Sequence, residues 1–393
     1  MKIKGNICET GGKKLPNGRF VNEDGLVSFT TKSGDKKYDF IILMDGATEL
    51  GKDHQIIEGY TSAEWYVKFV MGILQRVLTQ NPSYDLQAAV DFSISKAIDE
   101  IKDYEKKNGI TLEEYQKPSA GLSLLRTDGN TTEIYLIGDT QTLVAFKDGR
   151  VTTVDNPNQK ALQKLDKSVL DRMVELAKER NCDVIDTRTD DEIEKMLQVN
   201  RSKKNSNCED GYWVCGTTEG TAKHGVCVSF NNSELSGFVL ASDGFDFSVL
   251  DLDEKQVYKL ITEKGTKVVS DLIRKQQEQD PKCNKFPRFK KGDDLTVVHF
   301  DYLARDKNYD YERKYFNAEN GTRMGTVFFL LYQHCWSLYC CFKVSHLNDI
   351  FILQYTKALR NFHESIRHVT DSATHAQILN VSFQESWSTK FSF

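Results

Sequence analysis

Short apolar runs and longer amphipathic stretches alternate along the first 300 residues. The apolar runs end at turn residues, which is typical of buried strands. They lie at 26–30, 39–44, 122–126, 134–137, 142–146, 238–241 and 295–300. Apolar positions at helical spacing predict helices at 61–79, 84–107, 160–180 and 254–279. Thr61 and Glu64 have the spacing of a helix capping box, and Gly265 is a weak point in the last helix.

The charge density falls sharply near residue 315. Charged residues make up 98 of the first 314 positions but only 11 of the last 79. We therefore expect a folded body at 1–302, a polar linker at 303–320 and an apolar, low-charge tail of unknown role at 321–393. Within the body, 156–236 is expected to form a helical flap region.

The overall composition argues against several classes of protein. The chain has 393 residues and a formal net charge of −5, whereas nucleic-acid binders usually carry a basic excess. No run of 18 or more apolar residues is present, so a membrane span is not expected. Nine cysteines without a CxxC pair, and an N-terminal stretch without an apolar signal core, favour reduced thiols in the cytoplasm.

Acidic residues stand at the ends of the predicted strands. They are Asp45, Asp139, Asp243, the pair Asp293 and Asp294, and the pair Glu23 and Asp24. Each alone is an ordinary turn residue. If the strand ends converge, the like charges repel one another and require divalent cations. An all-oxygen ligand set favours Mg²⁺ or Mn²⁺ over zinc.

The acidic positions belong to a longer series of blocks. In chain order these are RFVNED at 19–24, MDG at 44–46, SAGLS at 119–123, GDT at 138–140, ASDG at 241–244 and GDDLTVV at 292–298. Their order resembles the metal-dependent (PPM-type) protein phosphatases, the type 2C serine/threonine phosphatases, over residues 1–302. The resemblance implies an α+β fold, a four-layer α-β-β-α sandwich with a central antiparallel β-sandwich flanked by helices.

The resemblance also implies a metal ligand set. Asp45 would bridge two Mg²⁺ or Mn²⁺ ions, and the Gly46 carbonyl would bind one of them. Asp243 and Asp293 would hold the other, with Asp293 preferred over Asp294 because the family's ligand is the first residue of its pair. Glu23 and Asp24 would serve the second ion, directly or through water.

Two further roles follow from the same alignment. Arg19 matches an arginine that grips the substrate phosphate, for which a guanidinium fork is well suited. Asp139 matches an aspartate that assists a third ion, so that two ions are expected and a third is possible. The acid often found four residues after Asp243 is replaced by Phe247, which argues against that third ion. No His follows Gly46, so protonation of the leaving group would fall to metal-bound water.

The implied activity is hydrolysis of phosphoserine or phosphothreonine in a phosphorylated protein substrate, with Asp45 and Arg19 as the central residues. Two alternatives stay open: a non-catalytic phosphatase-like binding module, and a phosphohydrolase acting on a small phosphoester. Cys215 lacks a CxxxxxR loop, so a cysteine phosphatase is not expected. Tyr212 and Trp213 could line a peptide groove, although packing on the sheet is the favoured interpretation for Trp213.

Overall fold

The structure is a computed structural model that describes residues 2–10, 13–14, 18–47, 50–51 and 55–303. Apart from Leu303, the expected linker at 303–320 and tail at 321–393 lie outside these residues.

Two five-stranded antiparallel sheets form the centre of the described part of the chain. In spatial order, the first contains β10 (Val226–Asn231), β7 (Thr131–Ile137), β6 (Ala120–Thr127), β5 (Lys36–Gly46) and β4 (Gly25–Ser33). The second contains β1 (Lys2–Thr10), β12 (Leu295–Leu303), β11 (Leu235–Ala241), β8 (Gln141–Phe146) and β9 (Val151–Thr153). A short hairpin joins β2 (Lys13–Lys14) to β3 (Phe20–Val21).

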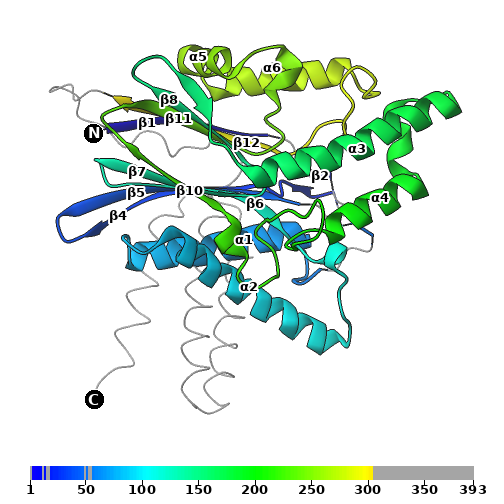
Figure 1. Cartoon of the computed structure of the whole chain (residues 1–393), viewed down its shortest axis with the longest axis horizontal. Coiled ribbons are helices and arrows are strands. Elements are labelled where there is room, and N and C mark those ends of the chain that lie inside the picture. The colour runs from blue at the N-terminus through cyan, green and yellow to red at the C-terminus, as the bar shows by residue number, and fades with distance from the viewer. Residues whose placement is uncertain (1, 11–12, 15–17, 48–49, 52–54, 304–393) are drawn as a thin grey trace, which may run out of the picture. The chain divides into compact units, whose positions relative to one another are not determined.

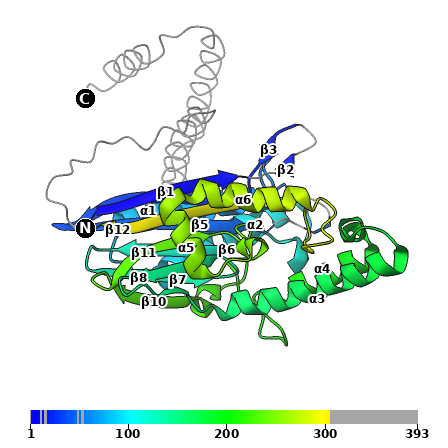
Figure 2. The same ribbon diagram turned by 90° about the horizontal axis from the view of Figure 1, so that it is seen from above.

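Helices cover the outer face of each sheet. The pair α1 (Ser62–Gln80) and α2 (Leu86–Asn108) lies on the first sheet, and the pair α5 (Glu254–Lys264) and α6 (Thr266–Gln279) lies on the second (Figure 1). Two further helices, α3 (Pro157–Arg180) and α4 (Asp191–Ser202), lie side by side beyond the sheets (Figure 2). Short 3₁₀ helices occur at Glu114–Gln116, Val184–Thr189, Thr221–His224 and Phe247–Leu250. The expected four-layer α-β-β-α sandwich is confirmed.

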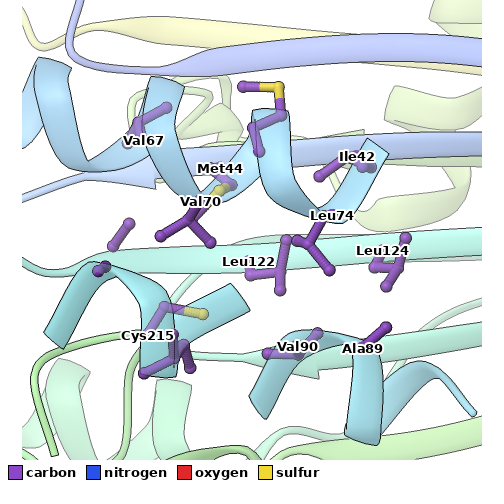
Figure 3. Packing of buried hydrophobic residues seen from close by; sticks show 14 of the residues in the cluster. Ile42, Met44, Val67, Val70, Leu74, Ala89, Val90, Leu122, Leu124 and Cys215 are labelled. Atoms are coloured by element: carbon purple, nitrogen blue, oxygen red, sulfur yellow. The ribbon is translucent and has the colours of Figure 1, made fainter. Parts of the chain in front are cut away.

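The apolar run in β5 explains how the layers hold together. Its side chains alternate, so Ile41 and Leu43 face the second sheet while Ile42 and Met44 face α1 and α2. A strand buried on both faces reads as a continuous apolar run. Figure 3 shows Ile42 and Met44 packed among side chains of α1, α2 and β6. This packing on both faces fixes the position of β5 between the layers, and therefore the position of the acidic residue at its end.

The structure corrects the expected helices in two places. The single helix at 254–279 is two helices, because Gly265 has a φ of 89° that ends α5 and begins α6. Thr61 caps α1 as expected by accepting from the Glu64 N–H at 3.1 Å. However, the Glu64 carboxylate binds Arg19 and Lys68 instead of completing a capping box.

Sequence periodicity did not predict β1, β10 or α4. β1 and β10 are edge strands. β10 alternates half-buried and exposed residues along Val226–Asn231, a period of two that a search for continuous apolar runs does not detect. None of the helices in the described ranges has the length and hydropathy that a bilayer crossing needs.

Candidate functional site

Strand pairing brings the acidic residues to one end of the sandwich. In the first sheet, Gly25 pairs with Met44 and Gly46 pairs with Ala120, so the start of β4 and the end of β5 lie together. Asp139 follows the end of β7, which pairs with the start of β6. In the second sheet, the end of β11 pairs with the start of β12, next to Asp243 and Asp293. Acidic residues that are far apart in the chain therefore lie at the same end of the sandwich.

Two hydrogen bonds connect the acidic segments across the two sheets. The backbone N–H of Asp243 donates to Asp45 Oδ2 at 2.8 Å. The backbone N–H of Glu23 donates to Asp294 Oδ2 at 2.7 Å. The first bond joins the end of β5 to the loop after β11, and the second joins the loop before β4 to the loop before β12, so the acidic segments contact one another directly.

Three glycines allow the acidic segments to approach closely. A Cβ on Gly46 would lie 2.4 Å from the Glu23 carbonyl oxygen, and one on Gly244 would lie 1.8 Å from the Asp294 carbonyl oxygen. A Cβ on Gly121 would lie 2.6 Å from Asp139 Oδ1. Any side chain at these positions would push the acidic residues apart.

The carboxylates lie close enough to perturb one another. Burial, followed by repulsion from Asp24, Asp139 and Asp293, raises the pKa of Asp45 well above its usual range. Burial and repulsion from Asp293 likewise raise the pKa of Asp139. Asp243 is exposed on one side, yet desolvation by the protein around its carboxylate, followed by repulsion from Asp45 and Asp293, raises its pKa as well. The cluster thus holds more negative charge than it can stabilise by itself.

Asp24 is the acidic residue whose carboxylate most needs a cation or a hydrogen-bond donor. Both of its carboxylate oxygens are shielded from solvent, and within the described residues neither has a hydrogen-bond partner at normal distance and angle. Burial, together with repulsion from Asp243 and Asp294, raises the pKa of Asp24 to about 8. The nearby Ser242 and Thr296 offset part of this rise. Orphaned buried carboxylate oxygens are costly unless a cation or donor satisfies them.

Asp293 and Asp294 point to different neighbours. Asp293 perturbs the pKa values of Asp45, Asp139 and Asp243 and therefore lies within the cluster. Asp294 accepts from the Glu23 backbone, and burial followed by repulsion from Asp293 raises its pKa to about 6.

The donor chemistry fits Mg²⁺ or Mn²⁺, because every candidate ligand is a hard oxygen. Nevertheless, among the described residues no group of three or more His, Cys, Asp or Glu side chains is gathered tightly enough to hold a metal ion as it stands. One candidate ligand is already engaged, since Lys290 Nζ lies 2.7 Å from Asp293 Oδ1. Ion binding would require these side chains to draw together.

Arg19 is paired with an acid of the neighbouring helix. Its guanidinium donates to the two Glu64 oxygens at 3.0 and 2.8 Å and to the Gly59 carbonyl at 2.6 Å. It also lies 5.6 Å from the centre of the Tyr60 ring. About a third of the side chain is exposed, at 36%. Arg19 is therefore held in place at the start of α1.

Sequence reasoning missed three residues beside the cluster. Lys290 was overlooked although it stands two residues before the GDD block that begins at Gly292. Asp166 on α3 and Arg201 on α4 lie near Asp139: burial, followed by Asp139, raises the pKa of Asp166 to about 6, and Arg201 opposes this. An acid on one amphipathic helix and a base on another carry no sequence signal that could have singled them out.

The flap residues considered from the sequence are packed. Tyr212 is 3% exposed, and Trp213 stacks on His224 with ring centres 3.4 Å apart. Cys215 is fully buried in the core cluster that contains side chains of α1 and α2 (Figure 3). Burial raises the pKa of its thiol far above the usual range. A buried neutral thiol is not a nucleophile, in agreement with the expectation from sequence.

Several solved structures are similar to this chain at low identity. Serine/threonine phosphatase Stp1 from Staphylococcus aureus aligns with 13% identity and a TM-score of 0.45, covering 77% of this chain and 96% of its own. The Mycobacterium tuberculosis serine/threonine phosphatase PstP/Ppp aligns with 12% identity and a TM-score of 0.43, covering 76% of this chain and 98% of its own.

The S. agalactiae serine/threonine phosphatase gives 12% identity, a TM-score of 0.44 and coverage of 77% and 100%. All three are described as serine/threonine phosphatases, the class whose motifs the sequence resembles. No protein-family model and no curated protein sequence matches the chain. The functional argument therefore depends on the residues of the chain itself.

Proposed function

We propose that this chain hydrolyses phosphate esters of serine and threonine in proteins, with Mg²⁺ or Mn²⁺ as cofactor. The catalytic unit would span 1–302, with 156–236 as the flap beside the site. The observation that carries the proposal is the meeting of carboxylates from both sheets around Asp24, whose buried oxygens form no hydrogen bond of normal geometry among the described residues. Such a cluster is stable in its charged form only with bound cations.

Asp45, the Gly46 carbonyl, Asp243 and Asp293 are the groups proposed to hold two ions, with Glu23 and Asp24 serving the second. When bound, such ions supply an activated water and stabilise the charge that develops on the phosphoryl group. The hydrogen bond from the Asp243 backbone N–H to Asp45 Oδ2 fixes the orientation of the Asp45 carboxylate. Asp139 adjoins this set and is the candidate for assisting a third ion.

Arg19 is the proposed phosphate-binding side chain. The Arg19 guanidinium is hydrogen-bonded to the Glu64 carboxylate in the structure. To bind a phosphate dianion it would have to give up one or both of these hydrogen bonds. Glu64 would then act as a positioning residue that keeps the guanidinium near the site when no substrate is bound.

The test is a phosphatase assay with a generic aryl phosphate and with phosphoserine and phosphothreonine peptides, in Mn²⁺ and in EDTA. We expect turnover that EDTA abolishes and that falls by at least about 10³-fold in Asp45→Asn and Asp243→Asn. Asp99→Asn is the matched control, because Asp99 is an exposed residue on α2 that pairs only with a surface lysine in the described contacts.

The outcomes separate the alternatives. Turnover of phosphopeptides above that of small esters supports the proposed substrate class, and the reverse order supports a small-molecule phosphohydrolase. If Mn²⁺ stimulates no turnover of any ester while the protein is folded, the enzyme proposal is wrong and a phosphatase-like binding module is favoured.

A further inference from the structure

Lys290 places an ammonium group on one of the proposed metal ligands. Its Nζ lies 2.7 Å from Asp293 Oδ1. Asp243 and Glu23 are near enough to attract the same positive charge. Three of the groups proposed to surround a divalent ion are therefore partly neutralised by a cation that belongs to the protein.

The loop that carries Lys290 is firmly anchored. Asp280 accepts the backbone N–H groups of Asn284 and Phe286 at 3.0 Å each and the Arg288 guanidinium at 2.9 Å. Arg288 also donates to the Gln277 carbonyl at the end of α6. These contacts fix the backbone before Lys290, so that its side chain starts from a defined place beside the site.

A second anchor lies after Lys290. The Arg274 guanidinium, on α6, donates to the backbone carbonyl of Asp293. The end of the loop at Asp293 is therefore tied to the same helix as its start at Asp280. Lys290 lies on the short segment between these two anchored points. Its side chain is 44% exposed, so the ammonium group has room to move toward solvent.

We propose that Lys290 is a built-in counter-ion that competes with Mg²⁺ or Mn²⁺ for Asp293 and thereby lowers the affinity of the site for metal. This inference rests on the proposed function, since it requires the cluster to bind divalent ions. On metal binding the ammonium moves out toward solvent and Asp293 turns to the ion.

Calorimetric titration of EDTA-stripped protein with Mn²⁺ tests this without any activity measurement. We expect Lys290→Met to bind Mn²⁺ about tenfold more tightly than the wild type, a difference of about 1.4 kcal/mol. Lys290→Arg keeps the positive charge and should stay within about threefold of the wild type. Lys291→Met is the matched control, since it removes the same charge from the adjacent exposed residue and should change the affinity less than twofold.

Thermal unfolding provides a second readout that also checks folding of each variant. Lys290→Met should melt below the wild type in EDTA, because the carboxylates lose their counter-ion, and should gain more from added Mn²⁺. Mn²⁺ affinity of Lys290→Met equal to or weaker than that of the wild type overturns the Lys290 inference while the proposed function stands. Absence of Mn²⁺ binding in every variant and in the wild type overturns both.

Discussion

Gly244 is the position where a single methyl group would most directly disturb the site. A Cβ there would lie 1.8 Å from the Asp294 carbonyl oxygen, whereas real contacts of this kind are not closer than 3.0 Å. Gly244→Ala therefore forces the two backbones apart by about 1.2 Å. Gly244 adjoins Asp243 and the displaced carbonyl adjoins Asp293, so the gap opens between two proposed metal ligands.

The expected effects follow from that displacement. Crowding of backbone against Cβ should lower the free energy of unfolding by about 1–3 kcal/mol. A misplacement of about 1 Å between ligands should lower kcat/KM by roughly 10²-fold, and should weaken Mn²⁺ binding as well. Urea unfolding, Mn²⁺ titration and a Mn²⁺-dependent phosphatase assay measure the three effects on the same preparation.

Gly129→Ala is the control for loss of stability alone. Gly129 has a φ of +88° in the turn between β6 and β7, at the end of the sheet away from the acidic cluster, and nothing lies within 4 Å of its added Cβ. The backbone strain should cost about 1–2 kcal/mol and leave kcat/KM unchanged. Wild-type stability and wild-type turnover in Gly244→Ala would refute the reasoning, because the close approach of β11 and β12 would then not shape the site.

Three further predictions concern other parts of the fold. Burial by itself would raise the pKa of Asp128, but hydrogen bonds from Lys36 and from the backbone of the turn outweigh burial and lower this pKa to about 2. A depressed pKa contributes stability above the unfolded value near 3.9 that is lost as the pH falls toward 2. Asp128→Asn should therefore cost about 1–2 kcal/mol at pH 7, and urea unfolding should show the gap to wild type closing between pH 5 and pH 2.5. Cys215→Ala should retain metal-dependent turnover, since the buried thiol takes no part in catalysis; loss of turnover with intact folding would contradict this. Leu124→Ala removes a fully buried side chain between β6 and the helix pair and should cost about 2–5 kcal/mol, measured by urea unfolding; a cost below about 1 kcal/mol would mean that this core is loosely packed.

Local pattern predicted most of the fold. The run at 39–44 became the doubly buried strand β5, and Thr61 caps α1. These features depend on spacing between near neighbours, which the sequence displays directly. Gly265 was recognised as a weak point, and in the structure its φ of 89° ends α5 and begins α6.

The acidic residues were predicted as a set because turn residues at strand ends are visible in the sequence. Their convergence depended on strand order, and the structure supplies it through the pairing of β4, β5, β11 and β12. The assignment of a metal ligand set remains a prediction. The partners of individual side chains could not be predicted at all, since Arg19 meets Glu64 across 45 residues of sequence.

By itself the sequence determined the alternation of strands and helices, the cap and glycine positions, and the presence of acids at strand ends, because each is encoded by residues a few positions apart. Folding alone buries the Asp24 oxygens without a hydrogen bond among the described residues, directs the Asp243 backbone N–H to Asp45, and sets Lys290 against Asp293. Those contacts join segments as much as 198 residues apart, and their energies depend on burial and on neighbouring charge. Neither quantity exists until the chain has folded.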